Sequence, residues 1–152
     1  MLTELQIVEL DTDDALAAAF PLMAELRPRV RREDFIPQVR AQQTEGYRLL
    51  GGSVGGRFVT LAGYRMATTL VRGRHLFVDD LVTAAAEQGK GYGTAMLRRL
   101  GEIARQEGVE RVCLDSRDTA RTFYERVGFT MHTSIPCYIE VAALQPRSGD
   151  GH

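Results

Sequence analysis

The sequence predicts an α+β domain in which one mixed, mostly antiparallel sheet is flanked by helices. The chain has 152 residues, of which 44% are apolar and 26% charged, and this fits a single domain with a full core. The middle of the chain has the apolar alternation of strands, bounded by turn signals. A helical pattern between two short apolar runs then indicates a β-helix-β unit, which usually joins parallel neighbours.

The N-terminal segment predicts a strand followed by a helix. Apolar alternation over residues 3–11 indicates the strand. Asp11 or Thr12 offers an N-cap for a helix over residues 13–26, whose first turn is acidic. Because proline removes a backbone donor and clashes with the preceding turn, Pro21 should kink or split this helix.

A second helix and three strands are expected next. The helix covers residues 32–46, with Gly46 at its end. Turn signals at Gly55–Gly56 and at residues 72–74 separate the strands, which should form an antiparallel meander. The three strands are predicted over residues 47–54, 57–70 and 74–83.

The last elements follow a glycine-rich loop. A helix over residues 94–108 has one apolar face, and the apolar run at residues 109–115 should lie parallel to the strand that precedes the loop. We further expect a short helix over residues 118–127 capped by Gly128, and final strands over residues 129–133 and 137–144. The predicted domain therefore spans residues 1–144, with a flexible tail at residues 145–152.

Composition argues against several classes of protein. A formal net charge of −1 does not favour a nucleic-acid binder. Cys113 and Cys137 stand in apolar surroundings without ligand spacing, so they are interpreted as buried hydrophobes and no metal site is predicted. No apolar run is long enough to span a bilayer and the N-terminus lacks a leader-like pattern, so a cytoplasmic location is expected. A local basic cluster is interpreted as a solvated loop and helix entry; it consists of Arg27, Arg29, Arg31 and Arg32.

Three glycines at alternate positions, Gly89, Gly91 and Gly93, stand directly before a predicted helix. Glycine is costly there unless the backbone must approach a ligand or adopt a left-handed conformation. The free amides and the positive dipole end of a helix N-terminus bind anions, and Lys90, the only lysine of the chain, lies in the same loop. The loop therefore predicts a site for a nucleotide-like diphosphate.

Other glycine motifs fit less well. Gly51 and Gly56 have the outer glycine spacing of a phosphate-binding P-loop, but Arg57 and Phe58 stand in place of its lysine and hydroxyl residue. The loop before the helix lacks the third glycine of a dinucleotide fingerprint. Gly51, Ser53 and Gly55 match the G-x-S-x-G pattern of hydrolases, but a strand follows where that nucleophile needs a helix. We interpret this match as a coincidence within a hairpin.

The stretch from Gln88 to Gly93, QGKGYG, resembles the (Arg/Gln)-x-x-Gly-x-(Gly/Ala) signature of the GNAT superfamily, the GCN5-related N-acetyltransferases. Two further segments are similar to that family. DDLVT at residues 79–83 corresponds to the strand ahead of the loop, and FYERVGF at residues 123–129 resembles its (Phe/Leu)-Tyr-Glu-x-x-Gly-Phe segment. The order of elements agrees from residue 5 to residue 141.

The resemblance implies the acyl-CoA N-acyltransferase fold and acetyl-CoA as co-substrate. It implies direct transfer of acetyl to a primary amine in a ternary complex. Backbone groups of the strand end would contact the pantetheine arm and thioester, and the loop would hold the diphosphate. These cofactor-binding residues are Leu81, Val82 and Thr83, followed by Gln88, Gly89, Lys90, Gly91, Tyr92, Gly93 and Thr94. The asparagine that the family often has seven residues before the tyrosine is Arg117 here, so that contact is not carried over.

The same resemblance suggests catalytic residues. Tyr124 would protonate the departing thiolate, since its ordinary pKa of about 10 keeps it protonated until then. Strand alternation places Asp79 and Asp80 on opposite faces, and Asp79 is preferred as general base, with His75 on its face a weaker candidate. Structural roles stay open: Tyr124 could pack in the core, and either aspartate could pair with an arginine.

The acceptor and the partners are left open. The acceptor pocket is expected to be formed by the first two helices, the loop between them and the turn after Leu70. Its candidate residues are Arg29, Arg32, Glu33 and Phe35. An acid at Asp79 suits a cationic amine, whereas the arginines suit an acceptor with a carboxylate. A non-catalytic acyl-CoA-binding or sensor module is the alternative to an enzyme. A homodimer through the edge of the last strand is a further expectation.

Overall fold

The computed structural model describes residues 4–144, which contain a five-stranded sheet in the order β1-β2-β3-β4-β5. The chain divides into an N-terminal unit up to Leu114 and a C-terminal unit from Asp115. The strands are β1 (Gln6–Glu9), β2 (Arg48–Val54), β3 (Arg57–Thr69), β4 (Gly73–Thr83) and β5 (Val112–Leu114). The α-helices are α1 (Asp13–Leu26), α2 (Arg32–Gln43), α3 (Tyr92–Gln106) and α4 (Arg121–Val127), and the 3-10 helices are η1 (Ala85–Glu87), η2 (Asp118–Ala120) and η3 (Val141–Leu144).

The predicted antiparallel meander and the parallel pair across the helix are both present. β1 to β4 pair in sequence order as antiparallel neighbours, and β5 pairs parallel to β4 after the crossover through α3. Gly55 and Gly56 join β2 to β3 with φ of 60° and 78°, which is the left-handed conformation that a tight hairpin turn requires. Ser53 lies in β2 before this turn, so the G-x-S-x-G match belongs to a hairpin, as expected.

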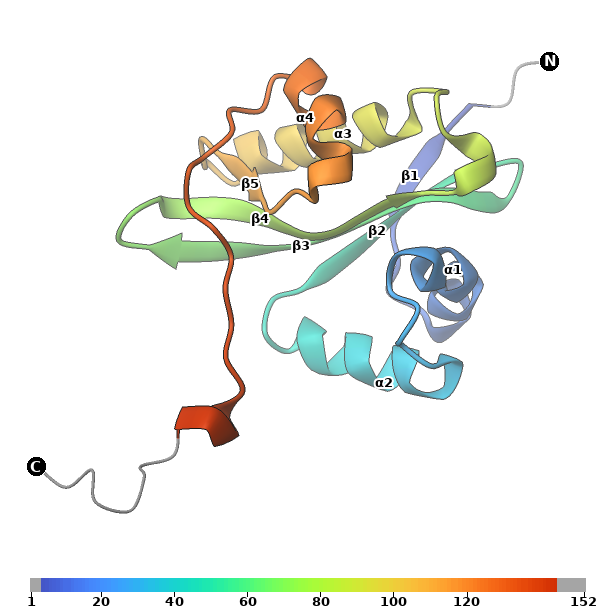
Figure 1. Cartoon of the computed structure of the whole chain (residues 1–152). Coiled ribbons are helices and arrows are strands. Elements are labelled where there is room, and N and C mark those ends of the chain that lie inside the picture. Colours follow the sequence, from blue (N-terminus) through green and yellow to red (C-terminus); the bar gives the residue numbers. More distant parts are fainter. Residues whose placement is uncertain (1–3, 145–152) are drawn as a thin grey trace, which may run out of the picture. The chain divides into compact units, whose positions relative to one another are not determined.

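Helices cover both faces of the sheet in the N-terminal unit. Figure 1 shows α1 and α2 on one face and α3 on the other. Thr12 is the N-cap of α1, and its hydroxyl accepts a bond from the Ala15 amide at 3.1 Å. Of the kink or split expected at Pro21, the split is wrong, because α1 continues through this residue. Buried apolar side chains stand on both sides of Pro21, and their packing offsets the missing backbone bond.

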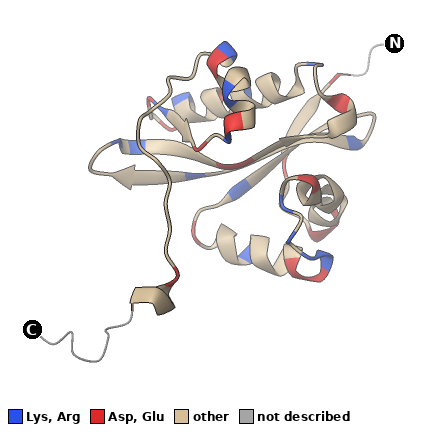
Figure 2. Cartoon of the chain, viewed as in Figure 1, with Lys and Arg blue, Asp and Glu red and all other residues tan. Residues whose placement is uncertain are grey.

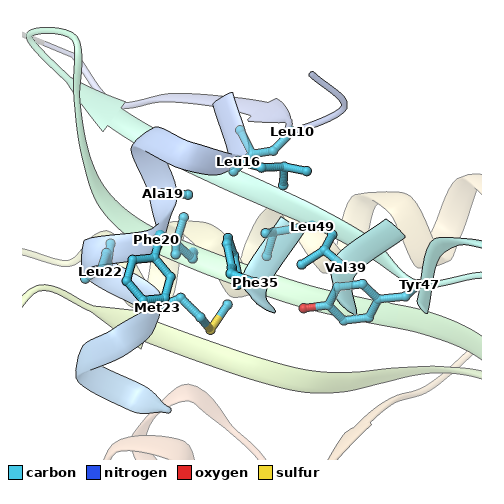
Figure 3. Packing of buried hydrophobic residues seen from close by; sticks show 11 residues of the cluster. Leu10, Leu16, Ala19, Phe20, Leu22, Met23, Phe35, Val39, Tyr47 and Leu49 are labelled. Atoms are coloured by element: carbon cyan, nitrogen blue, oxygen red, sulfur yellow. The ribbon is translucent and has the colours of Figure 1, made fainter. Parts of the chain in front are cut away.

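The main core lies between the sheet and the helices α1 and α2. Figure 3 shows its side chains in contact, including Phe20 and Phe35, whose ring centroids are 5.4 Å apart. The opposite face of the sheet is covered by α3, whose buried residues are those of the predicted apolar face: Met96, Leu97, Leu100, Ile103 and Ala104. None of the helices between residues 4 and 144 is long and apolar enough to cross a bilayer.

The C-terminal unit differs from the prediction after its helix. Gly128 ends α4 with φ of 116°, as expected. The final strands predicted over residues 129–133 and 137–144 are wrong, because the described chain up to residue 144 contains no strand after β5. Tyr138 is 90% exposed and Cys137 is exposed, so the expected burial of this cysteine is also wrong. Apolar alternation yields a strand only where a neighbouring strand pairs with it, and the described sheet provides none here.

Candidate active site

A β-bulge in β4 shapes the site. The register pairs Gly63 with Asp80 and then Tyr64 with Val78, so Asp79 is the extra residue of the longer strand. A bulge re-aims side chains that would otherwise alternate. Asp79 and Asp80 consequently line the same cavity, and the prediction that they occupy opposite faces is wrong.

The cavity lies among α1, α2 and the strands β3 and β4, and its volume is about 650 Å³. Its wall combines an apolar part and a polar part. The apolar residues are Met23, Val30, Phe35 and Val39. The polar residues are Arg27, Gln38, Gln42, Glu45, Tyr47, Arg65, Asp79 and Asp80. Figure 2 shows the corresponding charges, with acidic residues in the middle of β4 and basic residues on β3 and in the segment between α1 and α2.

Asp80 is held by two donors from distant parts of the chain. The Tyr47 hydroxyl donates to its Oδ2 at 2.7 Å, and Arg27 Nε donates to its Oδ1 at 2.9 Å. Arg27 also donates through Nη2 to the backbone carbonyl of Asp79 at 2.9 Å. Burial, and then the charge of Asp80, raise the pKa of Tyr47 above its ordinary value, so this residue is a hydrogen-bond donor.

Gly63 makes room for the Tyr47 side chain. A Cβ atom at residue 63 would overlap the Tyr47 hydroxyl and ring. Since Gly63 pairs with Asp80 across the bulge, the glycine, the tyrosine and the carboxylate form one packed unit.

Asp79 is the better candidate for a proton acceptor. Its side chain is 25% exposed and its Oδ2 accepts from Arg65 Nε at 3.0 Å. Burial raises the pKa of this carboxyl against the opposing effect of Arg65, and a raised pKa favours proton transfer near neutral pH. His75 is different, since it is 1% exposed, contacts the Gly73 carbonyl through Nδ1 and does not line the cavity. The structure therefore does not support His75 as a base.

The glycine loop has the backbone that the sequence indicates. Gly89 and Gly91 have φ of 85° and 84°, and Gly91 is the N-cap of α3. The first helical bond runs from the Ala95 amide to the Gly91 carbonyl. The amides from Tyr92 to Thr94 therefore precede the hydrogen-bonded ladder and suit an anionic group.

The buried carboxylate of Glu87 pairs with Lys90, the cation of the glycine loop. Glu87 is 8% exposed, and it accepts from Lys90 Nζ at 2.6 Å and from Arg57 Nη2 at 2.9 Å. Hydrogen bonds from these two cations lower the pKa of Glu87. The pairing fixes the position of Lys90 within the loop.

The strand before the loop diverges from its neighbour. β5 pairs with β4 only at Leu76–Val78. Residues 80–83 pair with β3 on the other side, and the Thr60 hydroxyl donates to the Val82 carbonyl at 3.1 Å. β5 therefore does not pair with Leu81, Val82 and Thr83.

Tyr124 belongs to the C-terminal unit. It lies in α4, is 9% exposed and packs edge-on against Phe123 and Phe129, with centroids 5.1 and 5.4 Å apart. Burial raises its pKa, so the hydroxyl is protonated at neutral pH.

Several cavity residues carry no sequence motif. Arg27, Tyr47 and Arg65 were not recognised as site residues, because each comes from a different element and only the fold brings them together. Arg27 was expected to be solvated as part of the basic cluster, but it lines the cavity and bonds to Asp80. Of the expected acceptor residues, Phe35 lines the cavity, whereas Arg29, Arg32, Glu33 and the turn after Leu70 do not.

A family model described as the acetyltransferase (GNAT) family matches residues 9–129. The chain belongs to this family. It is an acetyl-CoA-dependent acyltransferase, because acetyl transfer from acetyl-CoA is the general reaction of GNAT enzymes and acetyl-CoA is their co-substrate. The predicted family and the predicted fold class are both confirmed.

Known acetyltransferases resemble this GNAT chain in sequence and in structure. The uncharacterized N-acetyltransferase YhdJ of Bacillus subtilis is 30% identical over 132 residues, which cover 84% of this chain and 93% of that protein. The glucosamine 6-phosphate N-acetyltransferase of Trypanosoma brucei brucei is 34% identical over 79 residues, or 51% of this chain and 54% of the relative. The solved aminoglycoside N-acetyltransferase AAC(6')-Iy with CoA has a TM-score of 0.81 at 11% identity, covering 92% and 97% of the two chains.

Proposed function

We propose that the chain is an N-acetyltransferase that acetylates a primary amine by direct attack within a ternary complex. One observation carries this proposal: Asp79, the extra residue of the bulge in β4, lines the cavity two residues before Leu81. A proton acceptor and an acceptor pocket then adjoin the strand end that is proposed to bind the thioester.

The proposed reaction has two proton movements. The amine nitrogen forms a bond to the acetyl carbon, and its proton passes to Asp79, directly or through one water molecule. The carbon–sulfur bond breaks, and the thiolate takes a proton from Tyr124. A backbone amide near Val82 would stabilise the carbonyl oxygen as charge develops on it.

The cofactor contacts are proposed from the loop and strand geometry. The amides of Tyr92, Gly93 and Thr94 would bind the diphosphate at the N-terminus of α3, with Gln88, Gly89, Lys90 and Gly91 shaping the loop. Main-chain groups of Leu81, Val82 and Thr83 would bind the pantetheine arm where β5 no longer pairs with β4.

The names of related proteins support a small-molecule acceptor. One relative is named a glucosamine 6-phosphate N-acetyltransferase and another an aminoglycoside N-acetyltransferase. The proposed acceptor is thus a small-molecule amine or, alternatively, the amine of a peptide. We propose no nucleic-acid partner and no membrane partner.

Thiol release with a panel of amines tests the proposed function. Acetyl-CoA alone should release thiol slowly, and at least one amine should increase the rate in proportion to the enzyme concentration. Calorimetric binding of acetyl-CoA without release for every amine would favour the acyl-CoA sensor. Hydroxylamine, which consumes acetyl groups without enzyme, serves as the control for cofactor quality.

Three expectations accompany the proposal. Residues 1–144 form the proposed acetyltransferase domain, and residues 145–152, expected as a tail, lie outside the described residues. A cytoplasmic location is retained as a proposal. A homodimer is also retained as a proposal, although the segment 137–144, which was expected to offer a strand edge, is not a strand. Light scattering coupled to size-exclusion chromatography measures the oligomeric state.

A further inference from the structure

We propose that the acceptor is a small amine with a second cationic group on an aliphatic stem, and that amines bearing a carboxylate or phosphate are disfavoured. This inference rests on the proposed function, because it takes the cavity beside Asp79 as the acceptor site. It decides between the cationic and the anionic acceptor, which the sequence leaves open.

Both arginines of the cavity already have carboxylate partners. Arg27 bonds to Asp80 at 2.9 Å, and Arg65 bonds to Asp79 at 3.0 Å. Each guanidinium keeps N–H donors that these bonds do not use, but its charge is already balanced by a carboxylate. A carboxylate or phosphate of the acceptor would therefore lie close to Asp79 or Asp80, and like charges repel more strongly where water is partly excluded, as it is at Asp80, which is 14% exposed.

The two other arginines that were expected in the acceptor pocket lie outside the cavity. Arg29 does not line the cavity. Arg32 lies over the ring of Phe20, with its guanidinium carbon 4.9 Å from the centroid, and it does not line the cavity either. The basic cluster therefore provides no unpaired cation inside the acceptor site.

The charge of the cavity wall is negative. Two guanidinium groups, of Arg27 and Arg65, face three carboxylates, of Asp79, Asp80 and Glu45, which leaves one negative charge in excess. Within residues 4–144, the Glu45 carboxylate has no ion-pair or hydrogen-bond partner. It is exposed at the cavity wall, so it is available to pair with a second ammonium group of the acceptor.

The remaining wall suits a short aliphatic stem. Met23, Val30, Phe35 and Val39 present apolar side chains, and burying methylene groups against them is favourable. The side-chain amides of Gln38 and Gln42 have no hydrogen-bond partner among residues 4–144, so they can bind a polar substituent. The volume of about 650 Å³ lies in the range of small-molecule sites.

Three amines of equal chain length provide the test. They are 1,4-diaminobutane, butylamine and 4-aminobutanoate, which share a chain of four carbons and carry at the end opposite the reacting amine an ammonium group, no further group or a carboxylate. We expect kcat/KM to fall in that order and to differ by about tenfold or more between 1,4-diaminobutane and 4-aminobutanoate. The reason is that the negative cavity wall attracts the second ammonium group and repels the carboxylate. Glucosamine and glucosamine 6-phosphate form a second pair, in which the phosphorylated sugar should react more slowly.

A matched pair of variants assigns the effect to Glu45. Glu45→Gln should raise KM for 1,4-diaminobutane by roughly two- to fivefold, as for one exposed ion pair, and leave butylamine unchanged. Glu33→Gln is the control, since Glu33 pairs with Arg31 and does not line the cavity. Equal effects of both variants would overturn the role of Glu45.

A second variant tests the paired arginine. Asp80→Asn keeps the shape of the side chain and removes the charge that holds Arg27. The ratio of kcat/KM for 4-aminobutanoate to that for 1,4-diaminobutane should rise, with the folded state verified by its melting curve. An unchanged ratio would mean that Arg27 does not govern the selection against anions.

The outcomes separate the inference from the proposed function. Faster transfer to 4-aminobutanoate or glucosamine 6-phosphate than to the cationic or neutral counterpart would overturn the inference and leave acetyl transfer intact. Absence of thiol release with every amine would contradict the proposed function instead. In that case, calorimetric titration with the same amines still tests the inference, and equal or tighter binding of 4-aminobutanoate would overturn it.

Discussion

The Tyr47 hydroxyl donates a 2.7 Å hydrogen bond to Oδ2 of Asp80, a residue 33 positions later in the chain. This bond joins the residue directly before β2 to the bulge of β4. Arg27, which follows α1, holds the other oxygen of the same carboxylate. Asp80 therefore ties three separate elements together at the wall of the cavity, and Asp79 beside it is positioned by the same contacts.

Removal of the Tyr47 hydroxyl should destabilise the protein. Tyr47→Phe is expected to lower the free energy of unfolding by about 1–3 kcal/mol, the usual range for a hydrogen bond to a charged group. Urea denaturation measures this change. Tyr64→Phe is the control, because Tyr64 is similarly buried and its hydroxyl has no hydrogen-bond partner within residues 4–144. Equal losses in the two variants would show that the bond to Asp80 contributes nothing specific.

Two glycine substitutions should have opposite effects. Gly63→Ala places a methyl group against the Tyr47 hydroxyl and should destabilise the protein by about 1–3 kcal/mol through overpacking. Gly101→Ala, inside α3 with open space at its Cβ position, should stabilise it by about 0.5–1 kcal/mol through helix propensity. Thermal melting of both variants checks the two signs. A neutral Gly63→Ala would contradict the close packing of Tyr47.

The ionisation of Asp79 should affect rate and stability. Asp79→Asn is expected to lower kcat by about 10²-fold or more, as for loss of a general base, and to remove the acid limb of its pH profile. Asp34→Asn is the control, since Asp34 pairs with Arg31 outside the cavity. A retained acid limb in Asp79→Asn would assign that limb to another group.

The sign of the stability change follows from the pKa of Asp79. Burial raises this pKa above its ordinary value of 3.8. Between pH 3.8 and the raised pKa, the folded state therefore binds more protons than the unfolded state. The contribution of Asp79 is therefore fully present below pH 3.8 and is lost as the pH rises through the raised pKa. The difference in melting temperature, Asp79→Asn minus wild type, should increase with pH across this interval. A decrease would mean that Arg65 dominates the ionisation.

Tyr124 should act on turnover more than on cofactor affinity. Tyr124→Phe keeps the ring contacts with Phe123 and Phe129 and removes the proton donor. We expect kcat to fall by about 10²-fold and the dissociation constant of CoA to change by less than about twofold. Tyr138→Phe is a suitable control because Tyr138 is 90% exposed. An unchanged kcat would remove Tyr124 from the mechanism.

The elements with strong local signals were predictable from the sequence. The glycine loop before α3, the paired glycines of the β2–β3 turn and the apolar face of α3 each report local backbone or packing requirements. The sites of acid, base and cofactor were proposed from the resemblance to the GNAT family. Those assignments stay predictions, because the fold alone does not test them.

Other features depend on contacts between distant segments. The bulge at Asp79 could not be read from alternation, since it arises from the register between β3 and β4. The bonds from Arg27 and Tyr47 to Asp80 span 53 and 33 residues, and no motif marks them. The apolar pattern of residues 137–144 predicted a strand, but a strand needs a partner that sequence periodicity does not identify.

Calorimetric titration of the Gly91→Ala variant with coenzyme A is the most direct test of the account. Gly91 has φ of 84°, where alanine is strained, so the amides from Tyr92 to Thr94 should no longer converge on the diphosphate. We expect the affinity for coenzyme A to fall by about tenfold or more, and Gly101→Ala to bind coenzyme A like the wild-type protein. Wild-type affinity in a folded Gly91→Ala protein would contradict the assignment of the diphosphate to this loop.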